Sequence, residues 1–171
     1  MLLYLPAVTQ RHAGAQFKLG RMYEKGLGVA QDNAEAVRYY RLATEQGNPD
    51  AEYKLAKINL GDGDNSVLVV LHFKNAAKNG HPKAQFCLGE IFYYGEYVQK
   101  DYTEAVQLFR LAAAQGHSAA QNLLGFMFER GLGVAQDYVE AVRLYRLAVY
   151  KGYIDAQYRL GAMYDFGRGV E

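Results

Sequence analysis

The amino-acid sequence predicts an all-α solenoid of stacked helix-turn-helix repeats. The first reason is a recurring Ala-Gln-x-x-Leu-Gly pattern, whose full and variant copies start at Ala15, Ala51, Ala84, Ala120 and Ala156. Three of the four spacings are 36 residues and the other is 33. The second reason is that half of the 171 residues are apolar, enough for a continuous core. Repeats of this length bury their apolar faces against their neighbours, as in a solenoid.

Helix A, the first helix of each repeat, is predicted from the spacing of small and apolar residues. Four residues of the first repeat follow the i, i+4, i+7, i+8 stripe of one helical face: Ala15, Leu19, Met22 and Tyr23. Gly20 lies where a partner helix could approach closely. The equivalent positions hold Ala56, Gly89, Gly125 and Gly161. Helix A is expected to end at Gly26 and Gly28, because two glycines interrupt a helix and allow a positive φ.

Helix B, the second helix of each repeat, is predicted to begin at an aspartate cap. Asp32 is followed three residues later by Glu35, and this spacing returns at Asp101 with Glu104 and at Asp137 with Glu140. Such a cap satisfies free amide groups and complements the helix dipole, which stabilises a helix by about 1 kcal/mol. The expected buried face of the first helix B is Ala36, Tyr40 and Ala43. Glycines stand at the expected C-caps, at Gly47, Gly80, Gly116 and Gly152.

These signals divide the chain into six segments. Residues 1–14 align with the end of a preceding helix B, although Pro6 is unfavourable in a helix. The repeats are expected at 15–50, 51–83, 84–119 and 120–155, and residues 156–171 hold a helix A alone. Because solenoids normally need polar capping repeats, we expect a piece of a longer array, or ends that are buried in an oligomer.

The second repeat departs from the pattern. Its loop is three residues shorter, and Asn59 replaces an aromatic residue. Leu68 stands at the position of Glu35, and Leu71 stands at the position of Arg38. Since these positions are polar in the other repeats, Leu68 and Leu71 are predicted to form an additional apolar patch.

The pattern A-x-x-x-LG-x-x-Y-x-x-G-x-GV-x-x-D-x-x-x-A-x-x-x-[YF]-x-x-A-x-x-x-G strongly resembles the Sel1-like repeat, a relative of the tetratricopeptide repeat. The resemblance covers the chain from Ala15 onward. It implies a right-handed α/α superhelix in a family of adaptor and scaffold proteins, with helix A on the concave side. The shared positions are structural, so the resemblance supplies no catalytic residue.

The composition argues against several other classes of protein. The 19 basic and 18 acidic side chains are scattered, unlike the basic stripe that binds nucleic acid. No apolar run is long enough to span a membrane. Cys87 alone cannot form an intrachain disulfide or a cysteine-based zinc site, and no cofactor or metal is predicted. The chain start is a poor signal peptide, so we expect a soluble protein, cytoplasmic, or periplasmic or secreted if a signal peptide has been removed.

The variable positions of helix A supply the predicted partner-binding residues. Positions equivalent to residues 17, 21 and 24 share one helical face, which combines aromatic and charged residues as binding hot spots do. The candidates are Tyr93, Tyr94, Phe126, Phe86, Glu90, Tyr53, Lys57, Glu129 and Arg21, with Leu68 and Leu71 as a second patch. The alternative is that the aromatic residues at the position of Phe17 pack between repeats.

Three functions are compatible with the sequence. We favour a non-catalytic module that binds a protein or peptide in a groove lined by helix A. A self-assembling structural solenoid, joined through uncapped ends or through Leu68 and Leu71, is the first alternative. An enzyme of cell-wall or β-lactam chemistry is suggested only by relatives of the family, since neither Ser66 nor Ser118 begins an S-x-x-K motif.

Overall fold

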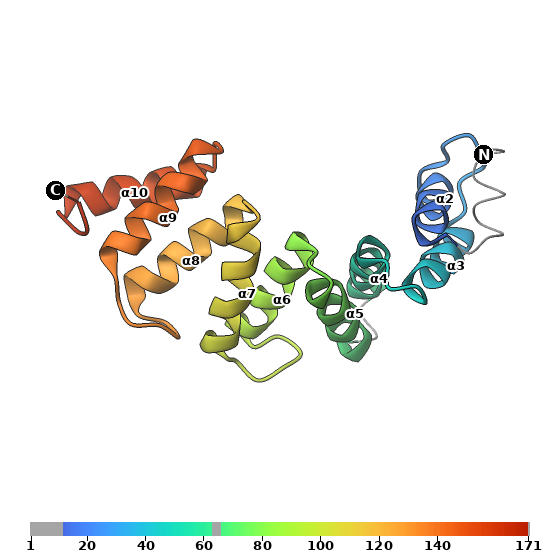
Figure 1. Ribbon diagram of the computed structural model, residues 1–171, viewed down its shortest axis with the longest axis horizontal. Coiled ribbons are helices and arrows are strands. Elements are labelled where there is room, and N and C mark those ends of the chain that lie inside the picture. The colour runs from blue at the N-terminus through green and yellow to red at the C-terminus, as the bar shows by residue number, and fades with distance from the viewer. Residues whose placement is uncertain (1–11, 63–65, 171) are drawn as a thin grey trace. The chain divides into compact units, whose positions relative to one another are not determined.

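The computed structural model describes residues 12–62 and 66–170 (Figure 1). This part of the chain contains nine α-helices and no strand, which confirms the predicted all-α class. The helices are α2 (Ala13–Lys25), α3 (Asn33–Thr44), α4 (Pro49–Asp62), α5 (Ser66–Lys78), α6 (Pro82–Tyr94), α7 (Tyr102–Ala114), α8 (Ser118–Arg130), α9 (Tyr138–Tyr150) and α10 (Ile154–Asp165). Most of the predicted segment 1–14 lies outside the described residues, as do residues 63–65 of the shortened loop.

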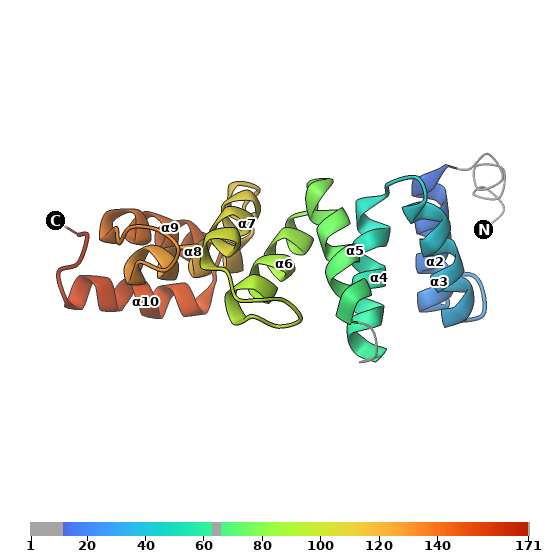
Figure 2. The ribbon, with the colours of Figure 1, turned by 90° about the horizontal axis from the view of Figure 1, so that it is seen from below.

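The helices α2, α4, α6 and α8 each pair with the helix B that follows in the chain, and α10 packs on α9 (Figure 2). The chain divides into two compact units, Met1–His81 and Pro82–Glu171. In unit 1, α2 packs on α3, α3 on α4, and α4 on α5. In unit 2 the same succession runs from α6 to α10. Within each unit the helix-turn-helix repeats are therefore as predicted, while the boundaries of the repeats stay a prediction.

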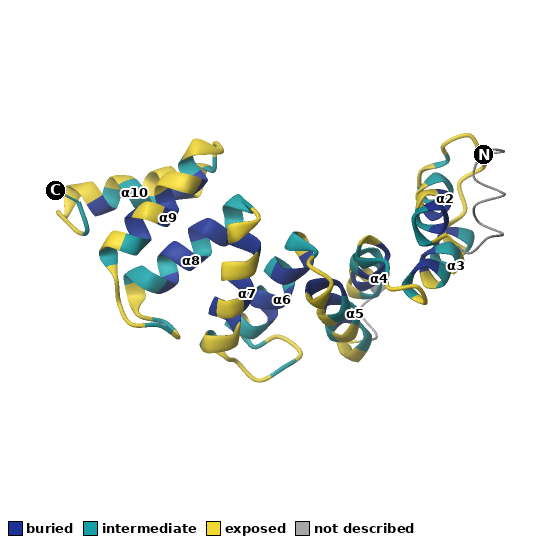
Figure 3. Cartoon of the chain, viewed as in Figure 1, coloured by how far each residue is buried: buried dark blue, intermediate teal, exposed yellow. Residues whose placement is uncertain are grey.

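The predicted helix caps are present. The Asp32 carboxylate accepts hydrogen bonds from the amides of Ala34 and Glu35 at 2.9 and 3.0 Å, and Asp101 caps α7 with the same two bonds. Asp137 caps α9 by accepting one hydrogen bond, from the Glu140 amide. The four glycines predicted at the C-caps of helix B have φ values between 73° and 83°. The cap residues of α3, α7 and α9 are Glu45, Gln115 and Lys151, so the glycines lie one or two residues after the caps. Exposed residues gather at the turns, and buried residues lie along the packed faces of the helices (Figure 3). Local sequence signals thus set where the helices begin and end.

The glycine of helix A admits a fully buried aromatic side chain from helix B. A Cβ atom built on Gly20 would lie 2.7 Å from Tyr40, and one on Gly125 would lie 2.8 Å from Tyr145. A Cβ atom built on Gly89 would likewise meet the ring of Phe109. The predicted close approach is therefore correct, and the close contact is with an aromatic ring.

Two of these buried aromatic residues are anchored by a carboxylate on helix A. The Tyr40 hydroxyl donates to Glu24 at 2.8 Å, and the Tyr145 hydroxyl donates to Glu129 at 2.7 Å. In the third repeat, Phe109 has no hydroxyl and Tyr93 stands at the position of the glutamate. Hydroxyl and carboxylate are thus present together or absent together in these three repeats, because a buried hydroxyl needs a partner.

The turn between α8 and α9 packs on the start of α7. Gly133 in this turn has a φ of 68°, and an added Cβ atom would lie 2.5 Å from the carbonyl group of Tyr102. Gly152, at the end of α9, has a similar φ of 77° but has no atom within 4 Å of an added Cβ. The two glycines therefore share a backbone conformation and differ in the space around them.

The histidines that follow the C-cap glycines serve as turn residues, as predicted. His117 caps α8, because its Nδ1 accepts a hydrogen bond from the Ala120 amide at 3.3 Å. Its ring stacks on Phe86 with a centroid distance of 4.6 Å. Burial, together with the positive charges of Lys83 and Lys151, lowers the pKa of His117. The neutral ring is the form that this site favours.

Unit 2 should accordingly lose stability on acidification. The folded-state pKa of His117 lies below its unfolded value of about 6.5, so protons bind more readily to the unfolded chain as the pH falls below that value. His117→Asn should reduce this loss, since Asn48 caps α4 at the equivalent position with a 2.9 Å bond from the Ala51 amide. Urea midpoints at pH 7 and pH 5 measure the effect. Equal losses in both proteins would contradict the assignment.

Candidate functional site

The helix-A side of unit 2 carries a cluster of aromatic residues that includes three of the predicted site residues. Tyr93 and Tyr94 contact each other edge to face, with ring centroids 4.8 Å apart. Tyr93 also contacts Tyr102 at 5.4 Å and is half-buried, whereas Tyr94 is 55% exposed. Burial is the main cause that raises the pKa of Tyr93, followed by the neighbouring Tyr102 and Tyr94. Phe126, on α8, is half-buried.

Arg159 of α10 joins these residues. Its guanidinium carbon lies 4.3 Å from the ring centroid of Phe126, in the geometry of a cation–π contact. Its charge also lowers the pKa of three tyrosines, Tyr93, Tyr145 and Tyr153, against the larger upward effect of their burial. Arg159 therefore lies at the centre of a surface built by α6, α8 and α10. It was not among the residues predicted from the sequence.

Asn122 is the second residue of this surface that was not predicted from the sequence. It lies on α8 one helical turn before Phe126, where the other repeats have Phe17, Tyr53, Phe86 and Tyr158. Asn122 is only 4% exposed, and no described residue donates a hydrogen bond to its Oδ1. A buried amide oxygen without a donor is unfavourable by about 1–3 kcal/mol. We define the α6–α8–α10 surface as Tyr93, Tyr94, Asn122, Phe126 and Arg159.

Other predicted site residues in unit 2 are engaged inside the repeats. Phe86 stacks on His117 and contacts Phe109 at 5.8 Å, which is the packing alternative predicted from the sequence. Glu129 accepts the hydrogen bond of Tyr145. Glu90 is half-buried on α6, and its charge acts on Tyr153. Phe86 and Glu129 therefore have structural roles that are sufficient to explain their residue types.

The predicted site residues of unit 1 lie on α2, α4 and α5. Arg21 and Lys57 are exposed, whereas Tyr53 packs on Phe73 and stacks on His81 at a centroid distance of 4.6 Å. In the second patch, Leu68 is half-buried and Leu71 is 46% exposed. Val67, which precedes Leu68, is 74% exposed, so Val67 and Leu71 are the more exposed apolar side chains of this part of α5.

The second repeat also carries a buried polar group. Glu52 stands where most repeats have glutamine, is buried, and contacts His72 Nδ1 at 2.5 Å. Asn75 donates a second hydrogen bond to Glu52 at 3.2 Å. His72 and Asn75 thus satisfy a carboxylate that has no counterpart in the other repeats.

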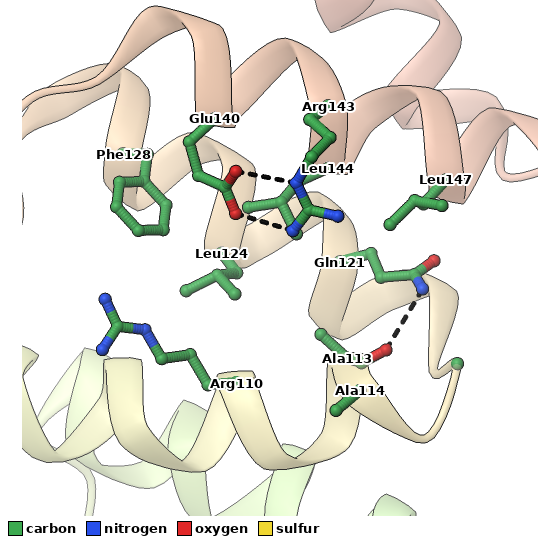
Figure 4. A pocket seen from close by; sticks show the side chains of 11 residues that line it. Arg110, Ala113, Ala114, Gln121, Leu124, Phe128, Glu140, Arg143, Leu144 and Leu147 are labelled. Atoms are coloured by element: carbon green, nitrogen blue, oxygen red, sulfur yellow. Dashed lines mark hydrogen bonds and ion pairs between the residues drawn. The ribbon is translucent and has the colours of Figure 1, made fainter.

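Unit 2 contains a cavity on the helix-B side, between α7, α8 and α9 (Figure 4). It has a volume of about 540 Å³, with Leu124, Phe128 and Leu144 among its lining residues. Gln121 lines one end, where its amide donates to the Ala113 carbonyl at 3.2 Å. Arg110 and the ion pair of Arg143 with Glu140 surround the other part.

The Gln121 amide oxygen has no donor among the described residues, and the repeats explain why. In the first and third repeats the equivalent glutamines, Gln16 and Gln85, accept hydrogen bonds from Gln46 and Gln115 at 2.6 and 2.8 Å. Lys151 stands at the position of these donors in the fourth repeat. Its Nζ atom binds the Gly116 carbonyl at 2.6 Å instead.

The described residues contain no group of three or more histidine, cysteine, aspartate or glutamate side chains that could hold a metal ion. Among these residues, no helix combines the length and the apolar character needed to cross a membrane.

Comparison with known proteins identifies the family. The model of the Sel1 repeat matches residues 13–48, 82–117, 118–153 and 154–171, and leaves out the divergent second repeat. A solved protective antigen of uropathogenic Escherichia coli is 35% identical over 99% of this chain and 37% of that chain, with a TM-score of 0.89. A Sel1 repeat protein from Oxalobacter formigenes is 32% identical over 100% of this chain and 72% of that chain, with a TM-score of 0.90.

A curated relative with a named role is chitin synthase regulatory factor 4 of Schizosaccharomyces pombe, which is 28% identical over 56% of this chain and 18% of its own length. The chain spans between 18% and 41% of the length of four curated relatives that it matches. The matched repeats cover most of the chain, and both solved structures agree with the predicted helical-repeat fold. The chain therefore belongs to the Sel1 repeat family.

Proposed function

We propose that this chain is a non-catalytic interaction module, an adaptor or scaffold, that binds a protein or peptide through the α6–α8–α10 surface. The observation that carries the proposal is the Arg159 guanidinium stacked on Phe126 beside Tyr93 and Tyr94. Tyrosine and arginine are among the residues most enriched in binding hot spots. A rigid helical array presents such a surface preformed, which keeps the entropic cost of binding low.

Membership of the family supports the same proposal. Two fission-yeast relatives are named as regulatory factors of chitin synthase, and a Rhizobium leguminosarum relative as a negative regulator of exopolysaccharide production. Regulation of another protein requires contact with a partner. The shared repeats supply structural positions, so a partner must be recognised by the variable helix-A residues that differ between repeats.

Truncation of the exposed aromatic pair tests the proposal. Tyr93→Ala combined with Tyr94→Ala should weaken partner binding by at least about tenfold, because hot-spot truncations cost about 2 kcal/mol or more. The measurement is a pull-down from lysate of the native host with both baits, followed by titration of the retained protein. Far-UV circular dichroism should show the same helix content in both proteins.

Tyr150→Ala is the matched control, because Tyr150 is a 90% exposed tyrosine on the helix-B side of the same unit. A partner that is lost by the double variant and kept by the control supports the proposal. Unchanged affinity of the double variant refutes the assigned surface. If no bait retains a partner and light scattering shows association that grows with concentration, self-assembly replaces the proposed function; exposed Val67 and Leu71 would then be the first residues to change.

A further inference from the structure

Arg159 of α10 is a half-buried arginine that lies against an aromatic ring. Arg38 and Arg143 each form an ion pair with a glutamate of their own helix, and Arg130 contacts Glu129. The ion pairs found among the described residues do not include Arg159. They do not include Arg110, Arg146 and Arg168 either, which also lie over aromatic rings, but these three arginines are exposed whereas Arg159 is half-buried. Its half-buried guanidinium is held on Phe126 and approaches the phenol of Tyr145.

A stacked guanidinium in this position favours an anion. Stacking on a ring fixes the plane of the guanidinium while N–H groups at its edge remain available, and a carboxylate accepts two such hydrogen bonds in parallel. Because the group is half-buried, an incoming carboxylate meets less solvent screening than at an exposed arginine. The positive charge of Arg159 therefore favours a ligand that places a carboxylate at this position.

Asn122 defines a second contact one helical turn away on the same face of α8. Residues four apart on a helix are neighbours, so the Asn122 amide and the Phe126 ring adjoin. The amide oxygen lacks a donor, which a peptide N–H group can supply. Since Oδ1 is fully buried, the side chain must rotate to bring its oxygen to the ligand. Binding would remove the cost of the unsatisfied oxygen.

We propose that the α6–α8–α10 surface binds a carboxylate-bearing peptide segment. Arg159 binds the carboxylate, Asn122 accepts a hydrogen bond from a peptide N–H group, and Tyr93 and Phe126 pack against the adjacent side chain. This inference rests on the proposed function and specifies the chemistry of the partner. The carboxylate belongs either to a C-terminus or to an aspartate or glutamate side chain.

Random octapeptide libraries distinguish these sources. Four libraries are needed: free or amidated C-termini, each made with and without aspartate and glutamate. The wild-type chain should enrich peptides from a library that offers a carboxylate, and none from the amidated library without acids. Enrichment from the acid-free library with free C-termini assigns a C-terminal carboxylate, and enrichment from the amidated library with acids assigns a side chain. Equal enrichment from all four libraries, or no enrichment from any, overturns the inference.

Substitutions of Arg159 and Asn122 test the roles of these two residues. The affinity of each variant for an enriched peptide is measured by fluorescence anisotropy. Arg159→Gln should weaken binding at least tenfold, whereas Arg110→Gln, which removes a charge stacked on Phe128 of the same unit, should leave it unchanged. Asn122→Phe restores the aromatic residue of the other repeats, so the chain should stay folded while binding falls. Equal affinity of Arg159→Gln and wild type overturns the inference.

The outcomes also separate the inference from the function on which it rests. If Tyr93→Ala with Tyr94→Ala weakens binding and Arg159→Gln does not, the surface binds peptides without a carboxylate contact, and only the inference fails. If neither change affects an enriched peptide, both fail. If no library yields a ligand but the pull-down retains a partner through Tyr93 and Tyr94, the proposed function stands without the inference.

Discussion

Gly133→Ala is expected to lower the stability of unit 2 by about 3 kcal/mol or more. A left-handed backbone costs a residue with a Cβ atom roughly 1–2 kcal/mol, and forced overpacking typically costs about 1–3 kcal/mol more. Both costs apply here, because φ is 68° and the new Cβ would lie 2.5 Å from the Tyr102 carbonyl. This carbonyl belongs to backbone at the start of α7, which cannot rotate away as a side chain can. The urea midpoint of the intact chain measures the loss.

Gly152→Ala separates the two costs. Gly152 has a φ of 77° and open space around it, so its replacement should cause only the conformational loss of about 1–2 kcal/mol. A Gly133 variant that is no less stable than the Gly152 variant would mean that the turn moves freely away from α7.

The second large effect is expected from Gly125→Ala, which should destabilise unit 2 by about 2 kcal/mol. The added Cβ would lie 2.8 Å from the Tyr145 ring and 3.3 Å from the Ala141 carbonyl. Tyr145 is fully buried and is held by its hydrogen bond to Glu129, so the ring has no free space to enter. Chemical denaturation measures the change, and near-UV circular dichroism reports the displaced tyrosine.

Gly161→Ala is the control for helix propensity. Gly161 occupies the same position of helix A in α10, and nothing lies within 4 Å of an added Cβ. Alanine there should stabilise the helix by about 0.5–1 kcal/mol. Replacing glycine by alanine at this helix position is thus expected to lower the stability where an aromatic ring lies against the glycine and to raise it where none does. If both variants gain stability, the contact with Tyr145 is not restrictive.

The sequence predicted the fold well because its signals are local and repeated. Asp32, Asp101 and Asp137 stand at helix starts, and their effect depends on the next three residues only. Gly47 and its equivalents act through their own φ. The identity of the ring above Gly20, Gly89 and Gly125 was not predicted, because that contact joins two helices and depends on how closely they pack.

The candidate site was predicted only in part. The pattern of helix A pointed to Tyr93, Tyr94 and Phe126, but not to Arg159, whose importance arises from a contact with the preceding repeat. Asn122 could have been noticed as the polar exception among four aromatic residues, although the sequence does not show that its oxygen lacks a donor. Glu129 was predicted as a partner-binding residue, but its carboxylate accepts the hydrogen bond of Tyr145, a contact between residues 16 apart that the sequence pattern does not show.

The joint occurrence of the buried hydroxyl and its carboxylate has a consequence for how such arrays grow and diversify. A chimera that joined α6 to α9 would place the Tyr145 hydroxyl opposite Tyr93, where no carboxylate stands at the required position. A chimera that joined α8 to α7 would leave Glu129 facing the hydroxyl-free ring of Phe109. Recombination within a helical hairpin therefore destabilises the product, whereas transfer of a whole hairpin keeps each buried hydroxyl together with its carboxylate. The heritable module of this array is the helix pair.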